Sequence, residues 1–243
     1  MSPPSTNWLL REPSPGDGPL LFVFPYGGAG ASSLRRWPSR IGDVEVQPVQ
    51  LPGRENRIRE EPYRDFDRFA REAVAALDPY LDRPYAVAGH CMGALLAHAF
   101  AARTEDSGAP PPRRLFVSAS LVPYRGFYGL YHPWMSDRRI AGELQRVAHD
   151  LGDGDLPPEL LSLSTRVLRA DVGMCLGYRP PPRPVDVAIS AIGWAGDVDV
   201  DGDDLAQWSE YGRTQTYLLP GDPLTFLAAP PGVRRIIEDD FEF

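Results

Sequence analysis

Short apolar runs alternate along this chain with stretches in which apolar residues return every three or four positions. Each run is bounded by Gly, Pro or charged residues, which is typical of buried strands. We therefore expect strands at 19–24, 44–51, 85–88, 115–119, 187–192 and 216–219. Helical spacing predicts helices at 32–41, 66–81, 94–102, 204–211 and 233–239. Strands and helices in alternation indicate an α/β protein with a mostly parallel sheet and helices on both faces.

The alternation stops between the fourth and fifth expected strands. For about 60 residues the pattern indicates mostly helix, from Tyr128 to Tyr178, interrupted by the acidic glycine-rich loop 152–155. A helical insertion between two strands is typical of a lid over an active site. We expect a single α/β domain over residues 1–243, with a lid insertion at 124–180.

The expected strand at 85–88 runs directly into Gly89-His90-Cys91-Met92-Gly93, and a strong helix-forming stretch follows. This is the strand-turn-helix pattern of a nucleophile elbow, G-x-S-x-G, with Cys in place of Ser. The turn forces its central residue into a left-handed backbone conformation, and a Cβ would clash at the two flanking glycines. Because Cys91 stands at a helix N-terminus, the helix dipole favours its thiolate. The pattern predicts an acyl-transfer enzyme with a sulfur nucleophile.

Composition narrows the chemistry and the partners. All 25 basic residues are Arg, which excludes a Schiff-base lysine, a lysine general base and a Walker P-loop. The net charge of −8 argues against nucleic acid as a partner. No apolar stretch is long enough to cross a membrane, and we see no signal-peptide pattern. We expect a cytoplasmic protein, where a reducing environment suits a thiol nucleophile.

Four further motifs occur in order along the chain: Phe24–Gly28, Gln50–Glu55, Leu168–Asp171 and Asp197–Trp208. Together with the elbow they cover nearly the whole chain, which resembles the type II thioesterases of polyketide and nonribosomal peptide assembly lines. The resemblance implies an α/β-hydrolase fold with a helical lid. It also implies that the substrate is an acyl group held as a thioester on the phosphopantetheine of an acyl or peptidyl carrier protein. We therefore expect no cofactor and no metal in the enzyme itself, and we expect a monomer.

The same resemblance implies roles for individual residues. Cys91 stands at the position of the family's serine nucleophile, and Asp197 stands at the position of the triad acid. Backbone N–H groups of Met92 and of Tyr26 or Gly27 would form the oxyanion hole. A glycine-rich turn after the first strand would let this backbone approach the substrate oxygen closely.

The chain departs from the family at the catalytic histidine. Family members carry it after the last strand, in a Gly-Gly-His-Phe-Phe-Leu type segment, whereas this segment is P-G-D-P-L-T-F-L at 220–227. Pro223 or a neighbour takes the histidine position, so Asp197 has no imidazole to orient there and is either the triad acid or a remnant that only caps a turn. A thiol tolerates this loss better than a hydroxyl, because a few per cent of it is thiolate at neutral pH.

The missing histidine affects the two steps of a thioesterase reaction differently. Attack on a carrier thioester expels another thiolate of similar pKa and needs little proton transfer. Hydrolysis must deprotonate water, a step in which a general base contributes about 10²–10⁴-fold. We therefore favour acyl transfer, or intramolecular Dieckmann-type cyclisation, over hydrolysis. Two alternatives stay open: an editing type II thioesterase that hydrolyses misloaded carriers, and a non-catalytic relative that binds the loaded carrier.

Several residues near these motifs have both a chemical and a structural interpretation. His132, at the lid entrance, could fold over Cys91 as a replacement base, or it is a surface aromatic. Asp222 could act as a carboxylate base, although a turn role is common in this sequence context. Residues 197–202 resemble the start of a calcium loop, but Trp208 stands at the twelfth position, where such loops carry Glu.

The remaining candidates have mainly structural interpretations. His90 precedes the nucleophile and is expected in the core, and His149 is expected at a helix C-terminus. His98 lies seven residues beyond the nucleophile, about 10 Å along the helix axis at the usual rise, so no contact is expected. Cys175 is expected to pack within a lid helix. Arg54 either locks its loop or meets a phosphopantetheine phosphate.

Overall fold

A computed structural model describes residues 7–125 and 134–241 of the chain. Within these ranges a seven-stranded sheet has the order β2-β3-β1-β4-β5-β6-β7. Neighbouring strands are parallel except for the antiparallel pair β2 and β3. This confirms the expected α/β class. The strands are Leu20–Phe24 (β1), Arg40–Ile41 (β2), Val44–Pro48 (β3), Tyr85–His90 (β4), Arg114–Ser118 (β5), Ala188–Trp194 (β6) and Thr214–Leu219 (β7).

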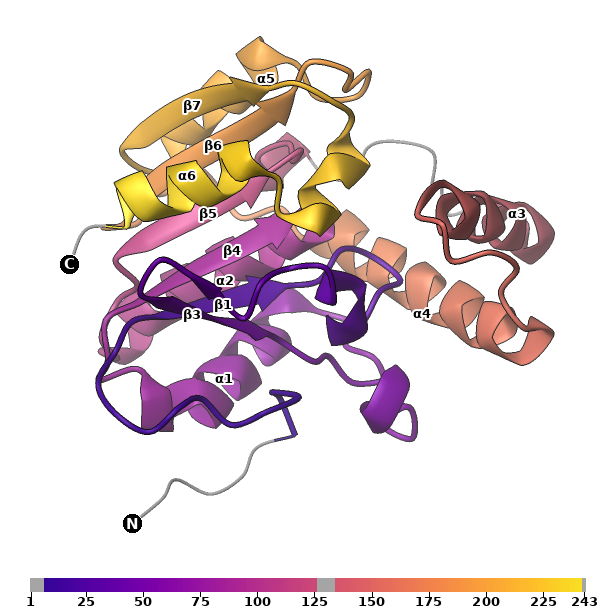
Figure 1. Ribbon diagram of the computed structural model, residues 1–243, viewed down its shortest axis with the longest axis horizontal. Coiled ribbons are helices and arrows are strands. Elements are labelled where there is room, and N and C mark those ends of the chain that lie inside the picture. The colour runs from indigo at the N-terminus through magenta and orange to yellow at the C-terminus, as the bar shows by residue number, and fades with distance from the viewer. Residues whose placement is uncertain (1–6, 126–133, 242–243) are drawn as a thin grey trace.

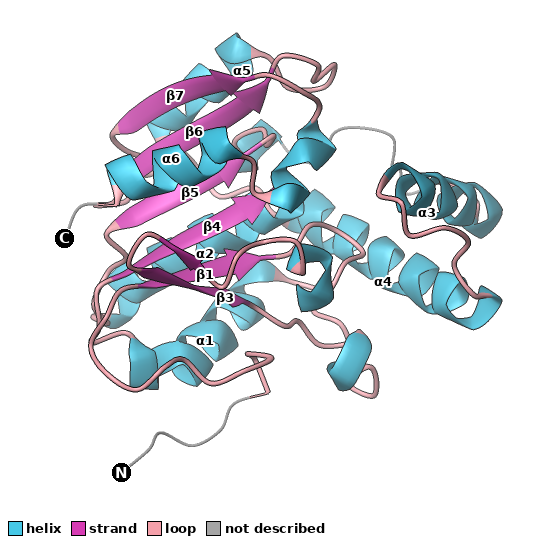
Figure 2. Cartoon of the chain, viewed as in Figure 1, coloured by secondary structure: helices cyan, strands magenta, loops and turns pink. Residues whose placement is uncertain are grey.

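Helices cover both faces of the sheet (Figure 1). Helices α1 (Phe66–Leu77), α2 (Met92–Ser107) and α5 (Gly202–Ala206) pack on one face, and α6 (Pro231–Asp240) packs on the other. Helices α3 (Asp137–Asp150) and α4 (Pro158–Gly177) lie between β5 and β6 in the chain and stand beyond the carboxyl ends of the strands (Figure 2). None of the helices in the described ranges is long and apolar enough to cross a bilayer.

The burial of β1 explains why the central strands are continuous apolar runs. All five of its residues are buried. Leu20 and Phe22 join the hydrophobic cluster under α1 and α2, whereas Leu21 and Val23 join the cluster under α6. A parallel sheet covered on both faces requires apolar side chains in both directions, so the period-two pattern of a half-exposed strand is absent.

Local signals set the bounds of the helix expected at 66–81. The Asp65 side chain accepts a hydrogen bond from the Arg68 N–H at 2.7 Å and caps the first turn of α1. The helix ends at Leu77, because Pro79 has no N–H to continue the ladder, and a 3₁₀ turn follows. The expected end at residue 81 was therefore too late by one turn.

The helix predicted at 32–41 is wrong. The structure has a single 3₁₀ turn at Ala31–Leu34, and Arg40–Ile41 pairs antiparallel with β3. Pro38 disfavours a continuous helix at this point. Trp37 is instead buried below α6, where its indole N–H donates to the Phe226 carbonyl at 3.0 Å.

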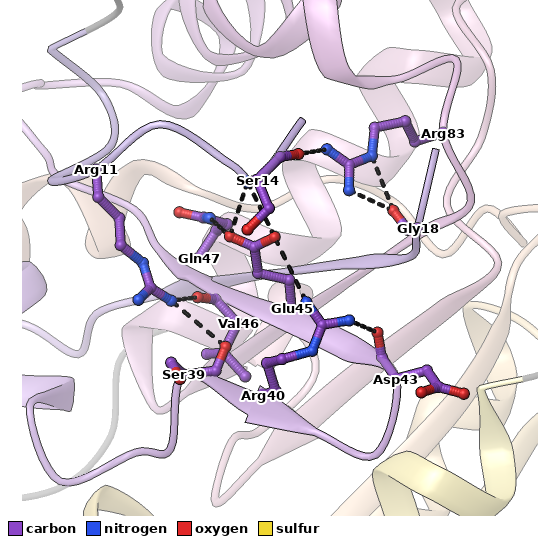
Figure 3. A network of polar contacts seen from close by, with 10 residues as sticks. All are labelled: Arg11, Ser14, Gly18, Ser39, Arg40, Asp43, Glu45, Val46, Gln47 and Arg83. Atoms are coloured by element: carbon purple, nitrogen blue, oxygen red, sulfur yellow. Dashed lines mark hydrogen bonds and ion pairs between the residues drawn. The ribbon is translucent and has the colours of Figure 1, made fainter. Parts of the chain in front are cut away.

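A polar network fixes the N-terminal segment to the amino end of the sheet (Figure 3). Glu45 on β3 is 5% exposed and accepts the Ser14 N–H at 3.1 and 3.0 Å, with Gln47 donating to it at 2.7 Å. Arg83 donates to the Gly18 carbonyl at 2.8 Å. This network lies at the opposite end of the strands from α3 and α4.

Candidate active site

The nucleophile elbow forms between β4 and α2. Cys91 has φ 54° and ψ −121°, and its N–H donates to the Ser118 carbonyl at 2.9 Å. A Cβ on Gly89 would lie 2.0 Å from the Gly93 carbonyl group, and a Cβ on Gly93 would lie 2.4 Å from the Phe24 carbonyl oxygen. Both glycines are therefore required for β4, α2 and β1 to approach this closely. The turn leaves the thiol of Cys91 at the N-terminus of a sixteen-residue helix.

Cys91 lines a cavity of about 970 Å³ at the carboxyl ends of the strands. Tyr26, Gly27 and Met92, the residues expected to form the oxyanion hole, line the same cavity, as does Asp197. On the side toward α3 and α4 the lining is mixed, with apolar Leu144, Val147, Leu156, Leu168 and Val172 beside polar Arg146, Asp150 and Ser164. Such a volume and lining suit an acyl group attached through one polar end.

The loop after β1 is held by residues that sequence reasoning did not connect. The Gly28 N–H donates to Asp171 Oδ2 at 2.8 Å, and Arg54 makes a bidentate pair with the same carboxylate, both bonds at 2.9 Å. Two further N–H groups of Arg54 donate to the carbonyls of Ala29 at 2.9 Å and Pro52 at 3.2 Å. This geometry supports the loop-locking interpretation of Arg54 over contact with a phosphate. Both motifs were noted in the sequence, but nothing in it signals a contact across 117 residues.

The two loops after β6 and β7 lie side by side, as a triad would require. The Gly196 N–H donates to the Gly221 carbonyl at 2.9 Å. Asp197, in the first loop, and Asp222 and Pro223, in the second, all line the cavity. Asp222 also stands at the N-cap of a short 3₁₀ helix.

Asp197 also organises its own loop. Its Oδ1 accepts the N–H groups of Asp199 at 2.9 Å and Val200 at 3.2 Å. Burial raises the pKa of Asp197, and these two hydrogen bonds oppose the rise. Within the described ranges, no group of acidic, Cys or His side chains is arranged to hold a metal.

His90 is the one histidine of the described residues that lines the cavity. Its ring stacks on Phe226 with centroids 5.1 Å apart, and its Nδ1 lies 3.2 Å from Ser118 Oγ. Burial lowers the pKa of His90 to about 3, so it is neutral and a weak base at pH 7.

The other histidines stand apart from the nucleophile or outside the described residues. His98 Nδ1 lies 3.0 Å from the Tyr178 hydroxyl, within an aromatic cluster. His149, in the last turn of α3, has its Nε2 2.8 Å from an Asp155 carboxylate oxygen. His132 lies outside the described residues, and its role as a replacement base stays a prediction.

Cys175 is buried on α4 and lines the same cavity as Cys91, and no disulfide joins these two cysteines of the described chain. Burial raises the pKa of Cys175 well above its usual value, and the nearby Cys91 and Asp171 raise it further. Its thiol therefore stays protonated, in keeping with a packing role, whereas Cys91 stands at a helix N-terminus.

The sheet, the elbow after its central strand and the loops around the cavity define an α/β-hydrolase fold with a cysteine at the nucleophile position. The chain belongs to the thioesterase domain family, whose profile matches residues 19–241. It is 29% identical over 245 residues to the linear gramicidin dehydrogenase LgrE of Brevibacillus parabrevis, covering 98% of this chain and 93% of that protein. It is also 29% identical over 206 residues to the gramicidin S biosynthesis protein GrsT of Aneurinibacillus migulanus, covering 83% of this chain and 80% of the relative.

Solved structures agree with this membership. The RedJ thioesterase from the prodiginine biosynthetic pathway of Streptomyces coelicolor superposes with a TM-score of 0.75 at 35% identity, covering 96% of this chain and 91% of RedJ. The type II thioesterase BorB from the borrelidin biosynthetic cluster has a TM-score of 0.82 at 26% identity, covering 98% and 99%. The predicted family and the α/β-hydrolase fold are thus confirmed. The roles of Cys91, Asp197 and the oxyanion-hole residues remain predictions.

Proposed function

We propose that this protein accepts an acyl group from a carrier-protein thioester onto Cys91 and passes it to an acceptor other than water. A second carrier thiol, an amine or a carbon nucleophile of the tethered chain could accept it. The observation that carries the proposal is a thiol at the elbow beside the cavity. The segment in which the catalytic histidine was expected contributes Asp222 and Pro223 to that cavity and contains no histidine. GrsT is named for gramicidin S biosynthesis and RedJ for the prodiginine biosynthetic pathway, which supports a carrier-bound substrate from a pathway of this kind.

The first step uses groups that the cavity supplies. The Cys91 thiolate attacks the carbonyl carbon, a new C–S bond forms, and the bond from that carbon to the pantetheine sulfur breaks. The N–H groups of Met92 and of Tyr26 or Gly27 face the transient oxyanion. Pantetheine leaves as a thiolate and takes a proton from solvent. One thiolate is consumed and one is released, so no general base is needed.

The second step decides between transfer and hydrolysis. Water must lose a proton as it attacks acyl-Cys91, and His90, with its pKa lowered to about 3, is a poor base for it. Without a base near pKa 7 this step loses about 10²–10⁴-fold. A thiolate or a free amine attacks without prior deprotonation, and an acidic carbon loses its proton far more easily than water does. Each acceptor expels Cys91 as a thiolate, and the protons that the amine or carbon loses go to solvent. Acyl-Cys91 therefore persists until an acceptor arrives.

Mass spectrometry of the protein after incubation with an acyl-pantetheine tests the proposal. We expect a stable acyl adduct on the peptide that contains Cys91, discharged by an added thiol. Cys91→Ala should form none, and Cys175→Ala, the matched control, should retain it. Rapid turnover to free acid without an adduct would refute transfer. Binding of a loaded carrier that is equal in the wild type and Cys91→Ala, without an adduct, would favour the non-catalytic alternative.

Editing hydrolysis is the second candidate, and one observation favours it. Asp197 and Asp222 line the same cavity as Cys91, and burial raises the pKa of Asp197, which makes it a better base than an ordinary carboxylate. In that case the wild type releases free acid, and Asp197→Asn or Asp222→Asn accumulates acyl-Cys91. The same assay therefore separates the two functions.

A further inference from the structure

We infer that Arg54 and Asp171 are positioning residues: their buried ion pair ties helix α4 to the loop after β1 and fixes the oxyanion-hole backbone. The inference rests on the proposed function, because an oxyanion hole matters only if Cys91 is acylated. Neither side chain is given a part in bond making.

The carboxylate of Asp171 is the centre of the connection. It is 3% exposed, and it accepts two hydrogen bonds from Arg54, which is 6% exposed, and one from the Gly28 N–H. Arg54 in turn donates to the Ala29 carbonyl at 2.9 Å. The Gly27–Gly28 and Ala29–Gly30 peptide groups are thus both hydrogen-bonded to one ion pair.

Helix α4 also packs against this loop through Leu168, which lies one helical turn before Asp171. A Cβ on Gly28 would lie 3.1 Å from the Leu168 Cβ, and a Cβ on Gly27 would lie 3.4 Å from the Leu168 Cδ1. Gly28 has φ +80°, a conformation that glycine adopts readily and other residues rarely do. The loop is therefore held by α4 through both packing and hydrogen bonds, directly beside the amides of Tyr26 and Gly27.

Such fixation matters because oxyanion stabilisation depends on donors that are in place before the reaction. A misplacement of about 1 Å at a reacting group can lower a rate by about 10²-fold. A buried ion pair, by contrast, is weak evidence for a stabilising role, because desolvation offsets much of its attraction. Stability alone therefore gives little reason to place this pair under the loop.

Arg114 and Asp240 provide a matched control elsewhere in the fold. Their side chains are 11% and 10% exposed and lie 3.0 Å apart, at the start of β5 and the end of α6. This pair is at the amino end of the strands, away from the cavity. Its disruption should affect stability without touching the oxyanion loop.

The experiment compares Asp171→Asn and Arg54→Lys with Arg114→Lys by two rates. The first is acylation of Cys91 by an acyl-pantetheine in a single turnover. The second is alkylation of Cys91 by iodoacetamide, which needs the thiolate but no oxyanion hole. We expect Asp171→Asn and Arg54→Lys to slow acylation about 10–100-fold while alkylation stays within about twofold. Arg114→Lys should lower the melting temperature and leave both rates unchanged.

Two results would overturn the inference: acylation within about threefold of wild type in both variants, or acylation and alkylation falling together. If Asp171→Asn fails to fold, Arg54→Lys carries the test, because lysine keeps the charge but loses the bidentate geometry. A wild-type protein that is alkylated but never acylated refutes the proposed function instead, so the two failures are distinguishable.

Discussion

Restoring the family's histidine should convert this protein into a faster hydrolase. Pro223 lines the cavity with Cys91 and Asp197, and the loops that carry Pro223 and Asp197 are joined by the bond from Gly196 to Gly221 at 2.9 Å. In Pro223→His the new imidazole would stand between a carboxylate and the acyl-cysteine. It would then activate water as a general base.

The usual contribution of a general base sets the size of the gain, and the place of Pro223 in the structure sets the cost. A general base contributes about 10²–10⁴-fold, so we expect deacylation of acyl-Cys91 to accelerate by at least about 10². Acylation should change little, because thiolate exchange does not need the base. Pro223 begins a 3₁₀ helix, where an N–H needs no partner within the helix, so its loss should cost only about 0.4–1 kcal/mol of stability.

The assay follows free acid released from purified acyl-Cys91 protein in a single turnover. Pro223→Ala removes the ring without adding imidazole and is the matched control. The rate of acid release by Pro223→His should rise as the pH increases through about 6.5, the usual pKa of histidine. Adding Asp197→Asn should remove most of the gain, because the carboxylate orients the imidazole.

The reasoning is refuted if Pro223→His releases acid no faster than Pro223→Ala. It is also refuted if the gain survives Asp197→Asn with an unchanged pH profile. In the first case something other than a missing base limits deacylation, and in the second Asp197 does not face the new imidazole.

Two further predictions concern stability. Burial lowers the pKa of His90 to about 3 and of His98 to about 4, so below pH 6.5 the unfolded state binds protons first. The free energy of unfolding should therefore decrease as the pH is lowered below about 6.5, by up to about 1.4 kcal/mol per pH unit for each histidine. In urea titrations at several pH values, the free energy of unfolding of His98→Phe should depend less steeply on pH than that of the wild type. Gly93→Ala should lower the free energy of unfolding by about 3 kcal/mol or more, because its Cβ would lie 2.4 Å from a backbone oxygen. The control Gly142→Ala, with open space around it inside α3, should stabilise by about 0.5–1 kcal/mol in the same titration.

The elbow and the central strands could be predicted because their physical causes are local. Two glycines two residues either side of Cys91, after an apolar run and before a helix former, allow few other structures. The helix predicted at 32–41 was wrong because its apolar residues are buried by tertiary contacts and not by lying on one face of a helix. Trp37 is buried against Phe226, which is far away in the sequence, and Pro38 breaks the periodic segment.

The candidate site was predictable in its parts but not in its connections. Motif positions indicated Cys91, Asp197 and the loop after β1, and the structure places them around one cavity. The bonds from Arg54 and Gly28 to Asp171 depend on how α4 docks, which no short-range pattern encodes. Which residue activates water is equally a matter of three-dimensional arrangement rather than of spacing.

The two helices beside the cavity, α3 and α4, are attached to the rest of the domain in different ways. Helix α4 is hydrogen-bonded to the loop after β1 through Asp171. Helix α3 contacts α4 through a small apolar cluster around Ile140 and through the exposed ion pair of Arg169 and Asp137. Under the proposed function, substitutions on α3 would reshape the cavity wall directly and would reach the loop after β1 through Leu168, so substrate preference could diverge among relatives with little change at the elbow.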